Sequence, residues 1–192
     1  MSTVLDVKNL SMHYETLAGN VSAVKDVSFS INSGESFGLV GESGCGKTSV
    51  AMTLLQLQPE NSVITEGSIK LDGKELVGLS EYELRKVRWD SISIVFQGAM
   101  NAWNPVIKIG EQIREALREH YPDNSKEDNI QKIQELFQMV GLDESIIDRY
   151  PHELSGGMKQ RAVIALALSC DPKIIIADEP TTCLLYTSDA AD

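Results

Sequence analysis

Residues 36–49, SFGLVGESGCGKTS, decide the fold. The apolar run 36–40 predicts a short strand, and helical spacing begins after Lys47. Between them, residues 41–48 match the pattern GxxxxGK[ST] in full. A glycine-rich turn that joins a strand to a helix presents backbone N–H groups to phosphate oxygens. The stretch therefore predicts an α/β protein with a phosphate-binding loop.

The residue types of this loop suit a nucleoside triphosphate. Glycines let the backbone turn inward where a Cβ would clash, and the helix that follows adds about half a positive charge at its N-terminus. Lys47 is expected to bind the β- and γ-phosphates, and the Thr48 hydroxyl to bind Mg²⁺. The alternative, a glycine-rich turn that binds nothing, is disfavoured by the Lys47-Thr48 pair in register. The residues expected to bind the nucleotide here are Gly41, Glu42, Ser43, Gly44, Cys45, Gly46, Lys47, Thr48 and Ser49.

A second acidic site follows the apolar run in KIIIADE, residues 173–179. This run predicts a buried strand with two carboxylates at its end. Asp178 is expected to hold the metal, and Glu179 to act as the general base that polarises the attacking water. Paired acids at a strand end are often only a solvated loop. A phosphate loop upstream favours the catalytic interpretation.

The N-terminal part of the chain reads as β-rich. Residues 4–14 and 22–31 alternate apolar and polar side chains, which is typical of half-buried strands. Residues 67–76 predict a hairpin that turns at Asp72-Gly73. A capping box of Ser80 and Glu83 then predicts the start of a helix, and residues 91–96 predict another strand.

From Gln97 to Pro151 the pattern becomes helical. In residues 125–142, the apolar side chains of Ile130, Ile133, Phe137 and Val140 share one helical face, and Gly141 suits the helix end. A further helix is expected from Ser155 before the strand that carries the acidic pair. The order of elements is that of an α/β protein with a helical insertion.

Composition limits the classes of function. The 192 residues include 17 basic and 28 acidic residues, a net charge of −11, which argues against a broad nucleic-acid-binding face. The three cysteines are widely spaced, which argues against a zinc site and a disulfide framework. No signal peptide or membrane-spanning stretch is expected from the sequence.

Residues 154–161, LSGGMKQR, resemble the signature of ABC ATPases, and the phosphate loop and IIIADEP occur in the order of that family. The resemblance implies a P-loop NTPase (RecA-like) core with an antiparallel β subdomain and an inserted helical subdomain. It implies that Ser155, Gly156 and Gly157 contact the γ-phosphate of ATP held by the opposite protomer. Locally, the same residues also read as a serine-capped helix start. By the same resemblance, Gln97 reaches Mg²⁺ or water, and Tyr14 stacks on adenine.

Within this family, residues 150–161 and 104–113 resemble the ATPase subunits of dipeptide and oligopeptide importers. Gly98-Ala99 and Trp103 depart from the Asp-Pro and Leu that are common there, and nickel importers share the pattern. The resemblance implies ATP and Mg²⁺ as cofactors, and as partners a second ATPase subunit, two permease subunits and, indirectly, a solute-binding protein. It places the chain peripherally on the cytoplasmic face of the membrane. The implied divisions are about 1–96 for the β subdomain and P-loop core, about 97–155 for the helical subdomain, and about 156–182 for the signature helix and acidic strand.

The resemblance covers residues 1–182 and ends before the last ten residues. The family expects an aspartate where Leu185 stands, and no histidine follows His152 to act as the family's switch residue. Codon-by-codon back-translation of residues 183–192 resembles a transposon-derived sequencing adapter, so this tail is interpreted as non-native. The C-terminal core strands of the family would then be missing, which predicts unpaired backbone groups and an unstable or aggregation-prone polypeptide.

Three functions remain open at this point. The first is an ATPase subunit that powers peptide import. The second is a nucleotide-binding fragment with little turnover. The third, a soluble ABC ATPase of translation or DNA repair, fits less well, because those proteins usually carry two cassettes or long coiled-coil or zinc insertions.

Overall fold

The computed structural model describes residues 2–179. The chain divides into two compact units, residues 1–88 (unit 1) and 89–192 (unit 2), and each is described by itself. The expected non-native tail, residues 183–192, and the position of Leu185 lie outside the described residues.

Unit 1 is built on a four-stranded antiparallel sheet in the order β2-β1-β3-β4. The strands are β1 (Thr3–Thr16), β2 (Gly19–Asn32), β3 (Ser62–Leu71) and β4 (Lys74–Glu75). This confirms the strands that alternation predicted. The β3–β4 turn also forms at Asp72 and Gly73, with φ of 48° and 79°, as the tight turn requires.

The central strand β1 keeps one face buried by means of an irregularity. Leu5 and Val7 are buried, and so are Leu10 and Met12, although strict alternation would place the second pair on the opposite face. The register shifts between Val7 and Leu10, where Asn9 takes a φ of 49°. The extra residue returns the apolar side chains to the core, as a β-bulge does.

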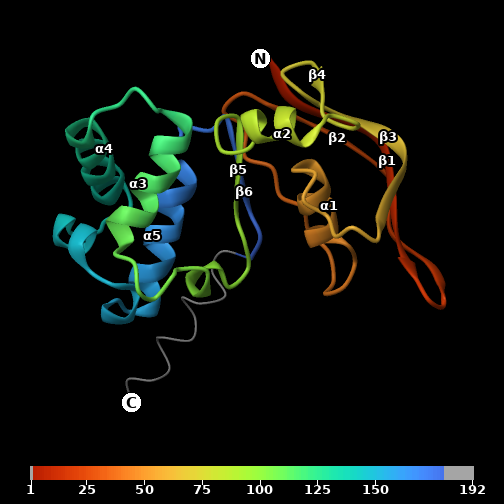
Figure 1. The fold of residues 1–192 in the computed structure, drawn as a ribbon. Helices are drawn as coiled ribbons and strands as arrows, with labels where there is room; N and C mark the ends of the chain where they lie inside the picture. The colour runs from red at the N-terminus through yellow and green to blue at the C-terminus, as the bar shows by residue number, and fades with distance from the viewer. Residues whose placement is uncertain (1, 180–192) are drawn as a thin grey trace. The chain divides into compact units, whose positions relative to one another are not determined.

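The β1–β2 hairpin extends beyond β3 (Figure 1). The last pair between β1 and β3 is Tyr14 with Ser62, and beyond it β1 pairs with β2 alone up to Thr16 and Gly19. The Thr16 hydroxyl donates to the Gly19 carbonyl at 2.6 Å, and Leu17 at the tip is fully exposed.

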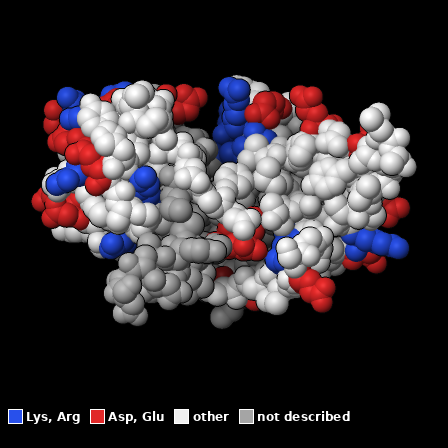
Figure 2. Space-filling model, turned by 90° about the horizontal axis from the view of Figure 1, so that it is seen from below, with Lys and Arg blue, Asp and Glu red and all other residues white. Residues whose placement is uncertain are grey.

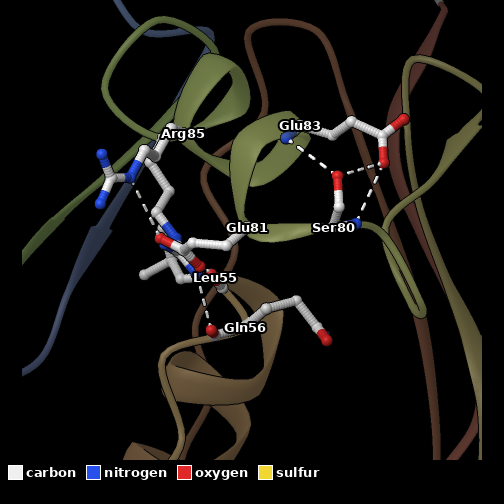
Figure 3. Close-up of polar contacts among 7 residues, drawn as sticks. Leu55, Gln56, Ser80, Glu81, Glu83 and Arg85 are labelled. Atoms are coloured by element: carbon white, nitrogen blue, oxygen red, sulfur yellow. Dashed lines mark hydrogen bonds and ion pairs between the residues drawn. The ribbon is translucent and has the colours of Figure 1, made fainter.

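Two helices complete unit 1. Helix α1 (Lys47–Leu54) follows the phosphate loop and buries Val50 and Leu54. Helix α2 (Glu81–Val87) begins at the predicted capping box, in which Ser80 and Glu83 bond reciprocally (Figure 3).

The predicted strand at residues 36–40 is wrong: this segment has no regular secondary structure. Leu39 is 43% exposed and Val40 is 93% exposed. A strand needs a hydrogen-bonded neighbour, and no strand in the described part of the chain pairs with this segment. Phe37 does stack on Phe29 of β2, with ring centroids 4.8 Å apart, which holds the start of the segment against the sheet.

Unit 2 is mainly helical. Helices α3 (Ile109–His120), α4 (Lys126–Met139) and α5 (Gly156–Leu168) pack together, with 3₁₀ segments at Ala99–Asn101, Glu144–Asp148 and Pro151–Glu153 (Figure 1). Strands β5 (Ile92–Val95) and β6 (Ile174–Ala177) form a parallel pair. The fully buried side chains of the helical core include Ile109, Ile113, Leu117, Ile133 and Phe137.

Helix α4 confirms the face predicted from its spacing. Ile133 and Phe137 are fully buried, and Ile130 and Val140 are partly buried. Gly141 ends the helix with a φ of 68°, and the Leu142 amide bonds back to the Phe137 carbonyl at 2.8 Å. This is the glycine-dependent helix end that the sequence indicated.

Strand β6 forms where predicted but is less buried than expected. Ile174 and Ile176 are partly buried, and Ile175 is 42% exposed. Among residues 2–179, β6 pairs along one edge only, with β5. A strand that pairs on one edge exposes more of both faces than the central strand that its apolar run predicted.

Charged side chains are mixed rather than segregated on the face drawn in Figure 2, where Lys and Arg lie among Asp and Glu. None of the helices in residues 2–179 combines the length and apolarity needed to cross a bilayer.

Candidate functional site

The phosphate loop depends on its glycines. Gly44 and Gly46 have φ of 80° and 96°, a region that other residues rarely adopt. A Cβ on Gly46 would lie 2.3 Å from the Ala23 carbonyl oxygen, and one on Gly41 would lie 2.5 Å from Cys45 Sγ. The backbone contact excludes a side chain at Gly46, whereas the contact at Gly41 is with the end of a side chain and Gly44 is favoured by its φ alone.

The side chain of Lys47 is held by backbone carbonyls of the phosphate loop. Its Nζ donates to the carbonyls of Gly41 and Glu42, both at 2.8 Å, and lies 3.8 Å from Cys45 Sγ. Lys47 is also the first residue of α1, so the ammonium and the positive end of the helix lie in the same place. This arrangement can attract and orient a polyphosphate.

Tyr14 lies close to the same helix. Its hydroxyl is 3.0 Å from the hydroxyl of Ser49, in the first turn of α1. The structure thus brings Tyr14 together with the loop residues in unit 1, which is where the adenine-stacking and phosphate-binding roles were expected. Glu42, Ser43 and Thr48 are exposed on the loop.

The acidic pair and Gln97 meet at one end of the parallel strands of unit 2. Val95 and Ala177 are partners in the β5–β6 register, and the Asp178 amide donates to the Val95 carbonyl at 2.9 Å. Two residues beyond each strand, Gln97 Nε2 donates to Glu179 Oε2 at 2.7 Å. The parallel register therefore places Gln97 beside Asp178 and Glu179.

Glu179 has a left-handed backbone, with a φ of 48°. A non-glycine residue in this region stores strain of about 1–3 kcal/mol, and such residues concentrate at functional sites. Asn9, Gln56 and Asp72 take the same backbone region outside the site, so this conformation alone does not mark a catalytic residue.

The signature residues begin helix α5. The Ser155 hydroxyl accepts from the Met158 amide at 3.3 Å, and Gly156 and Gly157 form the first turn. Ser155 is exposed. The local interpretation, a serine-capped helix start, is confirmed.

Two residues that support this helix were missed. Trp103, which the sequence marked only as a departure from its family, is buried and donates from Nε1 to the Lys159 carbonyl at 3.3 Å. Arg161 donates from Nη1 to the Gly141 carbonyl at 2.7 Å, and this bond connects α5 to the end of α4. For Trp103, the only signal in the sequence was the indole N–H, which needs a hydrogen-bond partner when a tryptophan is buried.

The predicted site residues divide between the two units. The phosphate loop and Tyr14 belong to unit 1, and Gln97, Asp178, Glu179 and Ser155–Gly157 belong to unit 2. In residues 2–179, no three His, Cys, Asp or Glu side chains gather to hold a metal ion by themselves.

The family model described as ABC transporter matches residues 24–182. The chain belongs to the ABC transporter family. The matched range contains the phosphate loop, Gln97, the signature and the acidic pair.

Curated relatives of this ABC transporter chain are named as peptide transport proteins. The dipeptide transport ATP-binding protein DppD of Lactococcus lactis is 46% identical over 97% of the chain and 54% of its own length. The oligopeptide transport ATP-binding protein AppD of Bacillus subtilis is 46% identical over 99% of the chain and 58% of its own length. The chain thus spans somewhat more than half the length of the curated relatives it matches.

Solved structures of ABC transporter cassettes share the fold. The dimeric structure of MJ0796, a bacterial ABC transporter cassette, has a TM-score of 0.84 at 32% identity, over 97% of this chain and 78% of that one. A post-hydrolysis state of MJ0796 bound to ADP and Pi has a TM-score of 0.82 at 32% identity, over 93% and 75% of the two chains. The expected α/β cassette architecture is thereby confirmed.

Proposed function

We propose that the chain is the ATP-binding and ATP-hydrolysing part of an ABC importer for dipeptides or oligopeptides. The observation that carries the proposal is the family match over residues 24–182, which contains the phosphate loop and the acidic pair in geometries suited to their chemistry. The names of the relatives support a peptide as the cargo. The relatives of known structure include a cassette bound to ADP and Pi, which supports a nucleotide ligand.

In this proposal the loop residues Gly41–Ser49 bind the triphosphate. The glycines leave room for close approach of the backbone, and Lys47 supplies a positive charge already centred in the loop. Tyr14, beside the first turn of α1, stacks on the adenine. The exposed Ser155 with Gly156 and Gly157 binds the nucleotide of a second cassette.

Thr48, Gln97 and Asp178 would hold Mg²⁺, which neutralises phosphate charge when bound. The donor set fits this ion, because all three offer oxygen atoms. Glu179 accepts the proton of the attacking water. Its bond from Gln97 orients the carboxylate, so the amide and the base act as one unit.

The proposed assembly is a pair of cassettes attached to two permease subunits. A solute-binding protein would deliver the peptide on the opposite side of the membrane. The dimeric cassette of known structure supports the pairing, and the peripheral place on the cytoplasmic face follows from the proposed attachment.

A single-turnover assay with the intact protein tests the enzymatic part. Lys47→Ala should abolish ATP binding, whereas Glu179→Gln should keep ATP binding and lose phosphate release by at least about 100-fold, as expected when a general base is removed. Lys25→Ala, which removes an exposed lysine on β2, is the matched control. Phosphate release by Glu179→Gln at the wild-type rate would refute the role of Glu179.

For the 192-residue chain alone, nucleotide binding without turnover is a second candidate. In this candidate the loop residues Gly41–Ser49 still bind the triphosphate, but turnover is low because Leu185 stands where the family expects an aspartate and no histidine follows His152. The same assay separates the two candidates, because bound ATP without phosphate release supports this one.

A further inference from the structure

Arg88 joins the C-terminal end of α1 to the start of α2. Its side chain is only 13% exposed, and all three guanidinium nitrogens donate hydrogen bonds. Nε bonds to the Leu55 carbonyl at 2.9 Å, Nη2 to the Gln56 carbonyl at 2.7 Å, and Nη1 to Glu81 Oε1 at 2.8 Å. Figure 3 shows Glu81 beside Leu55 and Gln56, where these contacts gather.

These bonds add to those that already close the C-terminal end of α1, such as the bond from Gln56 Nε2 to the Thr53 carbonyl at 2.8 Å. An isolated helix as short as the eight residues of α1 is not stable in water. Leu55 is the C-cap residue of α1 and Gln56 follows it, so the guanidinium bonds carbonyls just beyond the negative end of the helix. Gln56 then turns the chain with a φ of 52°, and the Leu57 amide bonds back to the Met52 carbonyl at 2.9 Å. Arg88 thus binds the helix where the chain leaves it.

The other end of the same helix carries the phosphate loop. Eight residues of α-helix are about 12 Å long and behave as one rigid body. Tyr14 bonds to Ser49 in the first turn, and Arg88 bonds to the carbonyls of Leu55 and Gln56, directly after the last turn. A tilt permitted at the Arg88 end would move Lys47 and the first-turn N–H groups at the loop end.

We propose that Arg88 is a positioning residue for the nucleotide. It fixes the C-terminal end of α1 and, through this helix, sets the place of Lys47 and the phosphate loop. This inference rests on the proposed function, because it concerns the site that the function assigns to ATP.

Arg85 provides a matched control on the same helix. It pairs with the same carboxylate, Glu81, at 3.5 Å, but its side chain is 74% exposed. Replacing Arg85 removes one positive charge from α2 and leaves the bonds to Leu55 and Gln56 in place.

The experiment is calorimetric titration of the intact protein with ATP–Mg²⁺. We expect Arg88→Ala to raise Kd about tenfold with unchanged stoichiometry, and Arg85→Ala to stay within about twofold of the wild type. Arg88→Lys should lie between them, at about threefold, because an ammonium cannot serve two carbonyls and a carboxylate in the geometry of the guanidinium fork. A purely structural role would lower the number of binding sites and leave Kd unchanged, and that result would overturn the proposal.

Hydrogen exchange gives a second readout that needs no nucleotide. The amides of residues 45–49 should exchange faster in Arg88→Ala than in Arg85→Ala. If Arg88→Ala does not fold, Arg88→Lys carries the same comparison, and exchange equal to that of the wild type would refute the inference. If the wild type fails to bind ATP, the proposed function fails, and the exchange rates alone then decide whether Arg88 positions the loop.

Discussion

Gly46 meets two requirements that no other residue type satisfies together. Its φ of 96° disfavours a side chain, and a Cβ there would lie 2.3 Å from the Ala23 carbonyl oxygen of β2. Sequence patterns identify such glycines from the motif alone. The structure adds that the closeness of a neighbouring strand, and not only the turn, excludes a side chain.

The first prediction separates these two requirements. Gly46→Ala should lower the free energy of unfolding by about 3 kcal/mol or more, because it adds a backbone clash to the cost of a positive φ. Gly78→Ala is the control, since Gly78 has a φ of 84° and no atom within 4 Å of its added Cβ. It should cost only about 1 kcal/mol. Equal costs in chemical denaturation would show that the clash is relieved.

Glu75 is stabilised in its charged form. Burial by itself raises the pKa of this carboxyl group, but hydrogen bonds from the Ser68 hydroxyl and the amides of Ile69 and Val77 outweigh it, so the pKa lies below the ordinary 4.5. A lowered pKa in the folded state stabilises the fold above the unfolded pKa. This stabilisation is lost as the pH falls through the folded value.

Glu75→Gln is therefore expected to destabilise unit 1 in a pH-dependent way. At pH 7 it should lower the free energy of unfolding by about 1–2 kcal/mol, through weaker hydrogen bonds. The difference from the wild type should shrink as the pH falls below 4.5. Denaturation curves from pH 7 to pH 3 measure this, with Glu66→Gln on the same strand as control. A difference that is constant with pH would contradict the prediction.

At the scale of elements, the contribution of helix α4 to stability depends more on its buried face than on its intrinsic helix propensity. Phe137 is fully buried in the core of unit 2, whereas Met139 of the same helix is 71% exposed. Phe137→Ala should cost about 3–5 kcal/mol, the usual cost of emptying an aromatic site in a core. Met139→Ala should cost less than about 0.5 kcal/mol. Thermal unfolding of both variants checks this, and similar shifts would show that the helical core is not closely packed.

The elements that sequence predicted well are those with local causes. The turn at Asp72-Gly73, the capping box at Ser80 and the helix end at Gly141 each depend on residues within a few positions of one another. The prediction of a strand at residues 36–40 was wrong because a strand depends on a partner elsewhere in the chain, which a local pattern cannot show. Strand β6 is less buried than predicted for the same reason, because the burial of a strand depends on the strands beside it.

The candidate site follows the same rule. The motif identified the phosphate loop because every residue in it is contiguous, and parallel register then placed Gln97 beside Glu179. Arg88 and Trp103 gave no comparable signal. Each acts on a backbone carbonyl 32 or more positions away, and a carbonyl has no sequence identity to detect.

For the molecule as a whole, charge and exposed apolar surface decide solubility. The net charge of −11 at pH 7 disappears near the isoelectric point of about 4.7. Val40 is 93% exposed, and Leu39 and Ile175 are each more than 40% exposed. Charge repulsion at neutral pH therefore opposes association through these side chains.

The purified 192-residue chain should consequently aggregate, most strongly close to pH 4.7. Light scattering between pH 4 and pH 8 measures this, and Val40→Ser should reduce the scattering at each pH. A monodisperse chain with one cooperative thermal transition throughout the range would contradict the expectation.

The long β1–β2 hairpin has a practical consequence. Its tip at Leu17 and Ala18 is closed by Thr16 and Gly19, and within residues 2–179 no other strand pairs with it there. Because Leu17 is fully exposed, an epitope or a fluorophore attached at this tip would lie outside the buried core of unit 1. The hairpin thus offers a handle by which the protein could be immobilised or labelled.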